Sequence, residues 1–285
     1  VPVYQMLGGK FRDKIRVYCD TDVRGKSTGL AMGEALKKRM EMGFTFLKMD
    51  VGIRLIQEEE GALCAPLDLF DEMKSGVRRP PKDLSDVERR ALHNRWYAFN
   101  NTAHPFTGIH ITEKGLDLLD RYVGEVRSVI GYEVPLATDH FGHIGIEDCI
   151  KVAQRLDKYN LSWYEDMIPW QYTKQYVRLA NSCQTPICTG EDIYLKESFR
   201  PLLESGGVSV IHPDLLTVGG IYELKKVGDM AQENGVAMAV HMAESPVACM
   251  GAVHAAAATE NFVALENHSV DVPWWNDLVT GLAYP

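Results

Sequence analysis

The chain has 285 residues, of which 46% are hydrophobic and 24% are charged, as is typical of a globular protein with one large domain or two smaller ones. Its formal net charge of −9 argues against nucleic acid or an anionic membrane as a partner. The sequence shows no signal peptide and no apolar run long enough to span a bilayer, so we expect a cytoplasmic protein.

From Lys14 onward, short apolar runs alternate with longer helical patterns, which is typical of βαβ units and a parallel sheet. Eight repeats within residues 14–269 favour a closed (β/α) barrel. An open doubly wound sheet is the alternative, but it predicts a glycine-rich phosphate turn where the sequence has DTDVRGKSTG. The predicted strands are residues 14–20, 44–51, 134–141, 161–168, 186–193, 208–215, 236–243 and 262–269.

One connection is much longer than the others. Residues 52–111 separate the second strand from a helix that begins near Thr112, and connections of this length are usually functional or disordered. This connection leaves the carboxyl end of a barrel strand, which is the face where such barrels carry their active sites. We interpret it as a lid whose Tyr97 and His104 bind substrate. A contact between subunits is a compatible alternative.

Three acidic residues occupy the same phase of consecutive units. Asp139, Glu165 and Glu191 end the third, fourth and fifth strands, and successive acids are 26 positions apart. Each alone could cap the following helix, but three in register would repel one another without a cation. The set therefore predicts a metal site, and its all-oxygen donors suit Mg²⁺ or Mn²⁺ better than Zn²⁺.

Two residues in the following units predict a general base. Asp214 ends the sixth strand and His241 ends the seventh, so the carboxylate could orient the imidazole and raise its basicity. The alternative is that His241 is a core histidine. Glu266 ends the eighth strand and could hydrogen-bond a substrate oxygen.

The second strand ends in Lys48 and Asp50, which are two residues apart and therefore both point into the barrel mouth. A lysine inside a barrel rarely serves packing. Lys48 could act through a lowered pKa, or remain charged and hold a carboxylate. An ion pair with Asp50 is the alternative.

Together these residues resemble the mandelate racemase and muconate lactonizing branch of the enolase superfamily, over nearly the whole chain. The specific pieces are the opening VPVYQMLGG, the three acids, the run IHPDLLTVGG, His241 and Glu266. The resemblance implies a TIM-type barrel of the modified (β/α)₇β form and one Mg²⁺ ion. It also implies a carboxylate substrate, which loses its α-proton to a base while the metal stabilises the enediolate.

The resemblance also implies a division of the chain. An N-terminal cap domain would be largely absent, with residues 1–13 as the linker from it and 14–269 as the barrel. Residues 270–285, which hold adjacent tryptophans, would pack toward the cap, because an exposed tryptophan pair is costly.

The chain departs from the branch at two positions. Asp50 stands where racemases have a second lysine base, which argues against two-base racemisation. Phe141 stands where sugar-acid dehydratases often place a histidine acid, with His140 and His143 on either side. Strand alternation directs His140 away from the site unless the strand ends before it.

We therefore predict a Mg²⁺-dependent dehydratase of a sugar acid, an aldonate, in which His241 removes the α-proton and water is then eliminated. We expect His140, His143, His104 and Tyr97 to bind substrate; candidate general acids are Lys48, His143, His104 and Tyr97. Alternatives are an epimerase, racemase or cycloisomerase, a non-catalytic relative that binds metal or sugar acid, and a barrel aldolase with a Schiff base on Lys48. We also expect a homo-oligomer.

The six cysteines form neither a C-x-x-C pair nor a zinc-finger spacing. Several lie in apolar patterns, which predicts buried free thiols, as in a reducing cytoplasm.

Overall fold

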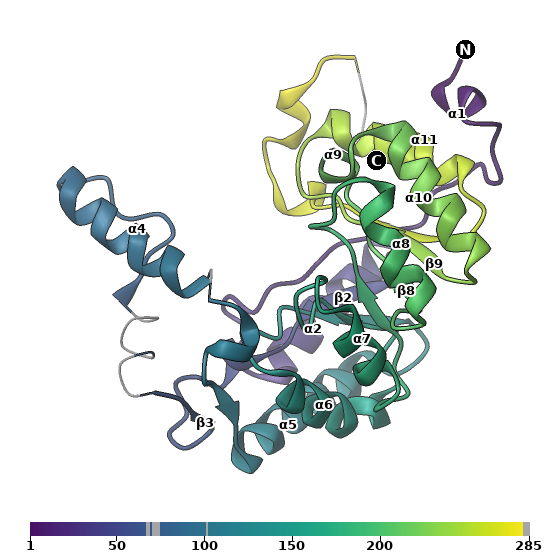
Figure 1. The fold of residues 1–285 in the computed structure, drawn as a ribbon. Coiled ribbons are helices and arrows are strands. Elements are labelled where there is room, and N and C mark those ends of the chain that lie inside the picture. The colour runs from purple at the N-terminus through teal and green to yellow at the C-terminus, as the bar shows by residue number, and fades with distance from the viewer. Residues whose placement is uncertain (67–68, 70–74, 101, 282–285) are drawn as a thin grey trace.

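The computed structural model describes residues 1–66, 69, 75–100 and 102–281, and its centre is a barrel of eight parallel strands (Figure 1). The hydrogen-bonded order is β1-β10-β9-β8-β7-β6-β5-β2. The backbone N–H of Asp50 donates to the carbonyl of Thr21 at 3.1 Å and joins the two ends of this order, so the barrel is nearly closed. The strands are β1 (Val17–Tyr18), β2 (Leu47–Asp50), β5 (Leu136–Asp139), β6 (Tyr164–Glu165), β7 (Ile187–Thr189), β8 (Val210–Ile211), β9 (Ala237–Val240) and β10 (Phe262–Glu266).

Helices between the strands cover the outside of the barrel (Figure 1). Within residues 1–281 as described, β10 is followed by 3₁₀ turns at Ser269–Asp271 and Trp275–Leu278 rather than by an α-helix. No helix among these residues is both long and apolar enough to cross a membrane. The helices are α1 (Val3–Met6), α2 (Gly29–Glu41), α5 (Glu113–Ile130), α6 (Ile146–Leu156), α7 (Thr173–Ala180), α8 (Leu195–Ser205), α9 (Leu215–Val218), α10 (Ile221–Glu233) and α11 (Pro246–Ala258).

Side-chain caps fix where several helices begin. Thr28, Thr112 and Ser245 accept hydrogen bonds from backbone N–H groups in the first turns of α2, α5 and α11. Each cap satisfies a donor that has no partner within the helix. The helix predicted to begin near Thr112 therefore begins directly after it.

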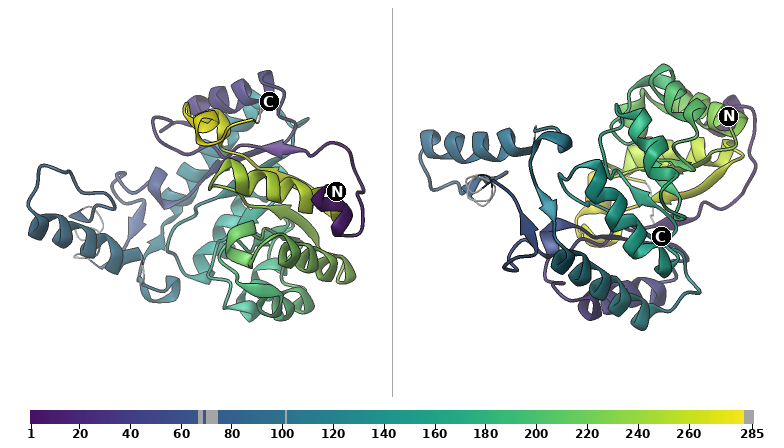
Figure 2. Two further views of the ribbon diagram at one scale, coloured as in Figure 1. Left: turned by 90° about the horizontal axis from the view of Figure 1, so that it is seen from above. Right: turned by 60° about the horizontal axis from the view of Figure 1, so that its bottom comes forward.

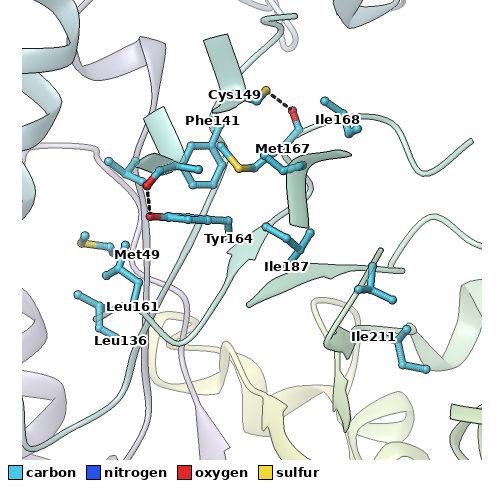
Figure 3. Packing of buried hydrophobic residues seen from close by; sticks show 14 of the residues in the cluster. Met49, Leu136, Phe141, Cys149, Leu161, Tyr164, Met167, Ile168, Ile187 and Ile211 are labelled. Atoms are coloured by element: carbon cyan, nitrogen blue, oxygen red, sulfur yellow. Dashed lines mark hydrogen bonds between the residues drawn. The ribbon is translucent and has the colours of Figure 1, made fainter. Parts of the chain in front are cut away.

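A large apolar core lies between the strands and the outer helices. Figure 3 shows the part in which Phe141 meets Tyr164 edge-on, with 5.7 Å between ring centroids. The hydroxyl of Tyr164 donates to the carbonyl of Ala153 on α6 at 2.9 Å. Cys149 on the same helix donates to the carbonyl of Met167 at 3.2 Å, so β5, β6 and α6 are joined by packing and by hydrogen bonds.

A second core fills the barrel interior, as expected for inward-facing residues of a small barrel. Phe46 and Trp163 stack at 4.8 Å between ring centroids, and small residues such as Ala137 and Ala239 pack around them. Because side chains alternate along each strand, residues two positions after these face the same interior, one layer nearer the carboxyl ends. That layer holds Lys48 and Glu165, so the polar site rests on an apolar floor.

The described part of the long insertion contains more regular structure than a loop. It includes a 3₁₀ turn at Ile53–Leu55, paired strands β3 (Leu63–Cys64) and β4 (His110–Ile111), helix α4 (Asp86–Asn100) and a 3₁₀ turn at His104–Phe106. Helix α4 stands apart from the barrel in Figures 1 and 2. In this structure α4 does not lie over the barrel, and the lid remains a prediction.

The two ends of the described chain lie against α11. Tyr4 stacks on His254 of α11 at 5.8 Å between ring centroids. Trp275 is buried near the same helix, whereas Trp274 is 57% exposed. Asp271 forms an ion pair with Arg39 of α2, with 2.6 Å between Oδ2 and Nη2. The described part of the tail thus packs on the barrel, and a cap domain remains a prediction.

All six cysteines are free thiols. Cys19, Cys149, Cys188 and Cys249 are buried and Cys183 is partly buried, as expected. Cys64 is exposed, because it lies on β3 of the insertion outside the barrel core.

The Phe141 ring tests how far the outer core supports the barrel. Phe141→Ala should lower the free energy of unfolding by about 3–5 kcal/mol, because it leaves a cavity beside Tyr164. The control is Phe106→Ala, since Phe106 is 77% exposed and its loss should change stability by less than about 0.5 kcal/mol. Urea unfolding gives both values, and equal losses would contradict this account of the core.

Candidate active site

The three predicted metal ligands converge at the carboxyl ends of neighbouring strands. Asp139 ends β5, Glu165 ends β6, and Glu191 lies two residues after β7. One oxygen from each lies within 4.8 Å of the other two. Glu165 is completely buried and Asp139 nearly so, whereas Glu191 is partly exposed toward the mouth.

Lys48 lies among these carboxylates on their buried side. Its Nζ is 3.1 Å from Asp139 Oδ2, 2.9 Å from Glu165 Oε1 and 3.3 Å from Glu266 Oε1. Burial acts to lower the Lys48 pKa, but the charges of Glu165, Glu266 and Asp139 outweigh it and hold the pKa well above its usual value. Lys48 is therefore a charged counter-ion for these carboxylates. The alternative of an ion pair with Asp50 is wrong, and a charged ammonium does not favour a Schiff base.

His241 and Asp214 form the expected pair. His241 Nδ1 is 3.0 Å from Asp214 Oδ2, and the other oxygen of Asp214 accepts the N–H groups of Leu216 at 2.8 Å and Thr217 at 2.7 Å. The same carboxylate thus caps α9 and orients the imidazole. His241 Nε2 faces Glu191 Oε2 at 3.4 Å.

The charges around His241 favour its protonated form in this state of the site. Burial opposes protonation, but the hydrogen bond to Asp214 and the charges of Glu266 and Glu191 outweigh it and raise the His241 pKa to about 10. The hydrogen bond from Nδ1 to Asp214 leaves Nε2 as the nitrogen directed at the carboxylates.

Glu266 closes the site from the end of β10. Its Oε1 lies 3.2 Å from His268 Nε2, in addition to its contact with Lys48. Its Oε2 is buried and has no hydrogen-bond partner in the described part of the chain. That oxygen lies 3.8 Å from His241 Nε2, so an acceptor stands beside the predicted base.

His140 turns into the site, as expected for a strand that ends before it. β5 ends at Asp139, and His140 takes a left-handed backbone conformation with φ of 58°. Its Nδ1 is 3.0 Å from Asp50 Oδ1 and 3.3 Å from Asp139 Oδ2. The charge of Asp139, followed by the hydrogen bonds to Asp139 and Asp50, raises the His140 pKa strongly.

His143 and His104 form one wall of a cavity of about 600 Å³. Their rings stack with centroids 4.5 Å apart. Burial, followed by the charge of His143, lowers the His104 pKa to about 4, and burial also lowers the His143 pKa. Both rings are therefore neutral near pH 7. Asp166, Thr189, Asp192 and Tyr194 also line this cavity.

Two of the sequence-predicted positions lie away from the reacting groups. Tyr97 is on α4, which stands apart from the barrel, and its ring stacks on His93 with 6.3 Å between centroids, so its role in substrate binding remains a prediction. Phe141 is buried in the outer core and offers no polar atom.

Several polar residues of the site were missed from the sequence, among them His212 and Asp20. His212 is completely buried, with Nδ1 2.8 Å from Glu165 Oε1 and Nε2 2.7 Å from the hydroxyl of Tyr18. Asp20 follows β1. One of its carboxylate oxygens lies within 4.8 Å of a carboxylate oxygen of Asp50 and of a ring nitrogen of His140. Strand alternation could have found both, because His212 precedes Asp214 by two residues and Asp20 follows Tyr18 by two.

Among the groups of candidate ligands in the described chain, Asp139, Glu165 and Glu191 alone offer only carboxylate oxygens. Hard divalent cations prefer oxygen donors, so this set fits Mg²⁺ or Mn²⁺. The other groups each contain a histidine, and one contains Cys188. Burial, together with the charges of Asp139 and Glu165, raises the Glu191 pKa against the opposing charge of His241. A bound cation would remove the repulsion among the three acids.

The chain is similar to known proteins in sequence and in fold. Residues 101–284 match the family described as enolase C-terminal domain-like. The chain is 31% identical over 280 residues to a D-xylonate dehydratase of Haloferax volcanii. This match covers 98% of this chain and 57% of that protein. It is 32% identical over 147 residues to a D-galactonate dehydratase of Ralstonia pickettii, which covers 52% of this chain and 38% of that protein.

The fold matches a crystal structure of a mandelate racemase/muconate lactonizing enzyme-like protein from Rubrobacter xylanophilus, with a TM-score of 0.72 and 26% identity. The match covers 97% of this chain and 63% of that one. The chain thus spans about half the length of the curated relatives that it matches over most of its own length.

Removing the Lys48 ammonium should destabilise the barrel. Lys48→Met leaves Asp139, Glu165 and Glu266 buried without their counter-ion, so we expect the free energy of unfolding to fall by about 3–5 kcal/mol. Lys174→Met, at an exposed position of α7, should change it by less than about 0.5 kcal/mol. Both are measured by urea unfolding without divalent cations; a loss below about 1 kcal/mol for Lys48→Met would show that Lys48 is not the counter-ion.

Proposed function

The chain belongs to the enolase superfamily, as a member of its enolase C-terminal domain-like family, and from this premise we propose that it is a divalent-metal-dependent dehydratase of a sugar acid. The observation that carries the proposal is the arrangement of Asp139, Glu165 and Glu191 within 4.8 Å of one another, with His241 held against Glu191 by Asp214. Relatives named as D-xylonate and D-galactonate dehydratases support an aldonate as the substrate.

We assign Asp139, Glu165 and Glu191 as the ligands of one Mg²⁺, with Mn²⁺ as a substitute. When bound, the cation would hold the substrate carboxylate and stabilise the negative charge that develops as the α-proton leaves. Lys48 supports the ligands from the buried side, because its ammonium fixes one oxygen each of Asp139 and Glu165.

His241 is the proposed base. Asp214 holds Nδ1, so Nε2 is the nitrogen that receives the α-proton, in the neutral ring that would result once a bound cation offsets the charge of Glu191. Asp214 is itself held by two N–H groups of α9, which limits the rotation of the imidazole. Glu266 offers its unpartnered Oε2 to a hydroxyl of the substrate beside that nitrogen.

His140 is the residue that we place against the leaving hydroxyl. The His140 side chain is 53% exposed at the barrel mouth. Its Nδ1 lies 3.0 Å from Asp50 Oδ1, and this contact fixes the orientation of the ring. The neutral rings of His104 and His143 would bind hydroxyl groups farther along the sugar chain, in the adjoining cavity. Asp50 in place of a lysine base supports elimination over two-base racemisation.

Loss of the base should abolish turnover. His241→Asn in the full-length enzyme with Mg²⁺ should reduce kcat on D-xylonate, D-galactonate or another aldonate by about 10³-fold. The control is His254→Asn, because His254 lies on α11 against Tyr4. Product analysis for loss of water and NMR of α-proton exchange in D₂O are the measurements.

Two results would count against this assignment. Unchanged turnover in His241→Asn would show that the base lies elsewhere. Exchange of the α-proton without loss of water from any aldonate would point to an epimerase.

Cation binding should depend on Glu191. Glu191→Gln removes one of three charges, so the Kd for Mg²⁺ measured by calorimetry should rise by about tenfold or more. Asp192→Asn is the matched control, since the neighbouring Asp192 is exposed and outside the three-carboxylate group. Equal affinities of the two variants would remove Glu191 from the ligand set.

A further inference from the structure

His212 is the only histidine in the described chain that is completely buried. It directly follows β8, and its backbone N–H donates to the carbonyl of Thr189 on β7 at 3.0 Å. Pro213 comes next and favours an extended backbone at His212. On the other side, a Cβ at Gly190 would lie 3.0 Å from the backbone nitrogen of His212, so glycine there permits the close approach. The backbone of His212 is therefore fixed from several directions.

The His212 ring is enclosed by other rings. Tyr18 stacks on it with 6.3 Å between centroids, Trp163 lies 6.2 Å away, and His241 meets it edge-on at 5.6 Å. Within this enclosure the two ring nitrogens face different partners. Nδ1 lies 2.8 Å from Glu165 Oε1, and Nε2 lies 2.7 Å from the hydroxyl of Tyr18.

These partners select one tautomer of His212. Tyr18 is completely buried, and among the described residues its hydroxyl is hydrogen-bonded only to His212 Nε2. Burial, followed by the charge of Glu266, raises the Tyr18 pKa well above its usual value, so the hydroxyl keeps its hydrogen and donates it to Nε2. The single N–H of a neutral imidazole is then on Nδ1. A bare Nδ1 would instead place a lone pair 2.8 Å from a carboxylate oxygen of Glu165.

Glu165 is approached by donors at both of its oxygens. Oε2 accepts a hydrogen bond from Trp163 Nε1 at 2.7 Å, and Oε1 accepts one from Lys48 Nζ at 2.9 Å. His212 Nδ1 approaches Oε1 too, but it is buried and no acceptor in the described chain is aligned with its N–H. A buried N–H without an aligned acceptor costs free energy. It therefore favours orientations of the Glu165 carboxylate that bring Oε1 into line with it.

We propose that His212 is a positioning residue for the metal ligand Glu165, with Tyr18 selecting the tautomer that donates from Nδ1. Partners of this kind orient a ligating carboxylate, and their loss typically weakens metal binding by about 10–100-fold. A neutral donor does this without adding a positive charge that would oppose the cation. The inference rests on the proposed metal site, but the tautomer of His212 can be measured without a cation.

An alternative is that Glu165, Cys188 and His212 hold a softer cation of their own, since one ligand atom of each lies within 4.8 Å of the others. Two observations oppose it. Lys48 Nζ already lies 2.9 Å from Glu165 Oε1. Burial, followed by the charge of Glu165, raises the Cys188 pKa well above its usual value, which opposes the thiolate that such a cation needs.

The first test is NMR of the ring nitrogens of His212, in full-length enzyme labelled with ¹⁵N-histidine and free of divalent cations. Protonated and bare ring nitrogens differ in chemical shift, so the spectrum separates the two neutral tautomers from the doubly protonated ring. We expect the tautomer with hydrogen on Nδ1, with the signals assigned by their loss in His212→Asn. Hydrogen on Nε2 alone, or on both nitrogens, would overturn the inference.

The second test is the Kd for Mg²⁺, measured by calorimetry. His212→Asn keeps an N–H near the position of Nδ1, whereas His212→Gln moves the amide toward the position of Nε2. The Kd should therefore rise by about tenfold or more in His212→Gln and by less than about threefold in His212→Asn. Tyr18→Phe, which removes the donor to Nε2, should give an intermediate rise. The matched control is Tyr164→Phe, because that hydroxyl is also buried but donates to Ala153, and its loss should leave the Kd unchanged.

Far-UV circular dichroism shows whether each variant keeps its fold. Equal Kd values for His212→Gln, His212→Asn and the unaltered enzyme would overturn this inference and leave the proposed metal site intact. An equal rise in both His212 variants would overturn it too, because packing alone would explain that result. Absence of Mg²⁺ binding by the unaltered enzyme would overturn the proposed metal site and this role of His212 with it.

Discussion

The ammonium group of Lys48 is the constraint on which the barrel mouth depends. Parallel strands bring Asp139, Glu165 and Glu266 to one edge, where burial would make three like charges prohibitively costly. The register between β2 and β5 pairs Lys48 with Ala137 and Asp50 with Asp139, which sets the ammonium one layer below the acids. Strand register therefore decides the electrostatics of the site, and a shift by one residue would turn Lys48 to the outer core.

Histidines at different places on the rim of the barrel mouth favour opposite protonation states. The rings of His104 and His143 stack in a partly buried wall, where desolvation keeps them neutral. His140 and His241 lie against carboxylates, which favour their charged forms. The mouth thus offers uncharged hydrogen-bonding groups on one side and ionised pairs on the other, a division that suits a substrate with a carboxylate head and a hydroxylated chain.

Residue spacing predicted the strands, the convergence of the three acids and the pairing of His241 with Asp214, because a repeating βα unit returns each strand end to the same edge. It left the direction of His140 open, because alternation holds only while the strand continues, and β5 ends one residue earlier. It could have found His212, which shares a face with Asp214. It could not place α4, because an apolar stripe shows that a helix packs without showing on what.

Left-handed backbone at the strand ends has a consequence for evolution of the site. His140 directly follows Asp139, and Asp166, with φ of 47°, directly follows Glu165. A non-glycine residue in this conformation costs roughly 1–2 kcal/mol. Glycine would relieve that cost at both positions but would delete the side chains that face the mouth. Selection for thermal stability would therefore favour glycine at these two positions, whereas selection for turnover would favour the present side chains.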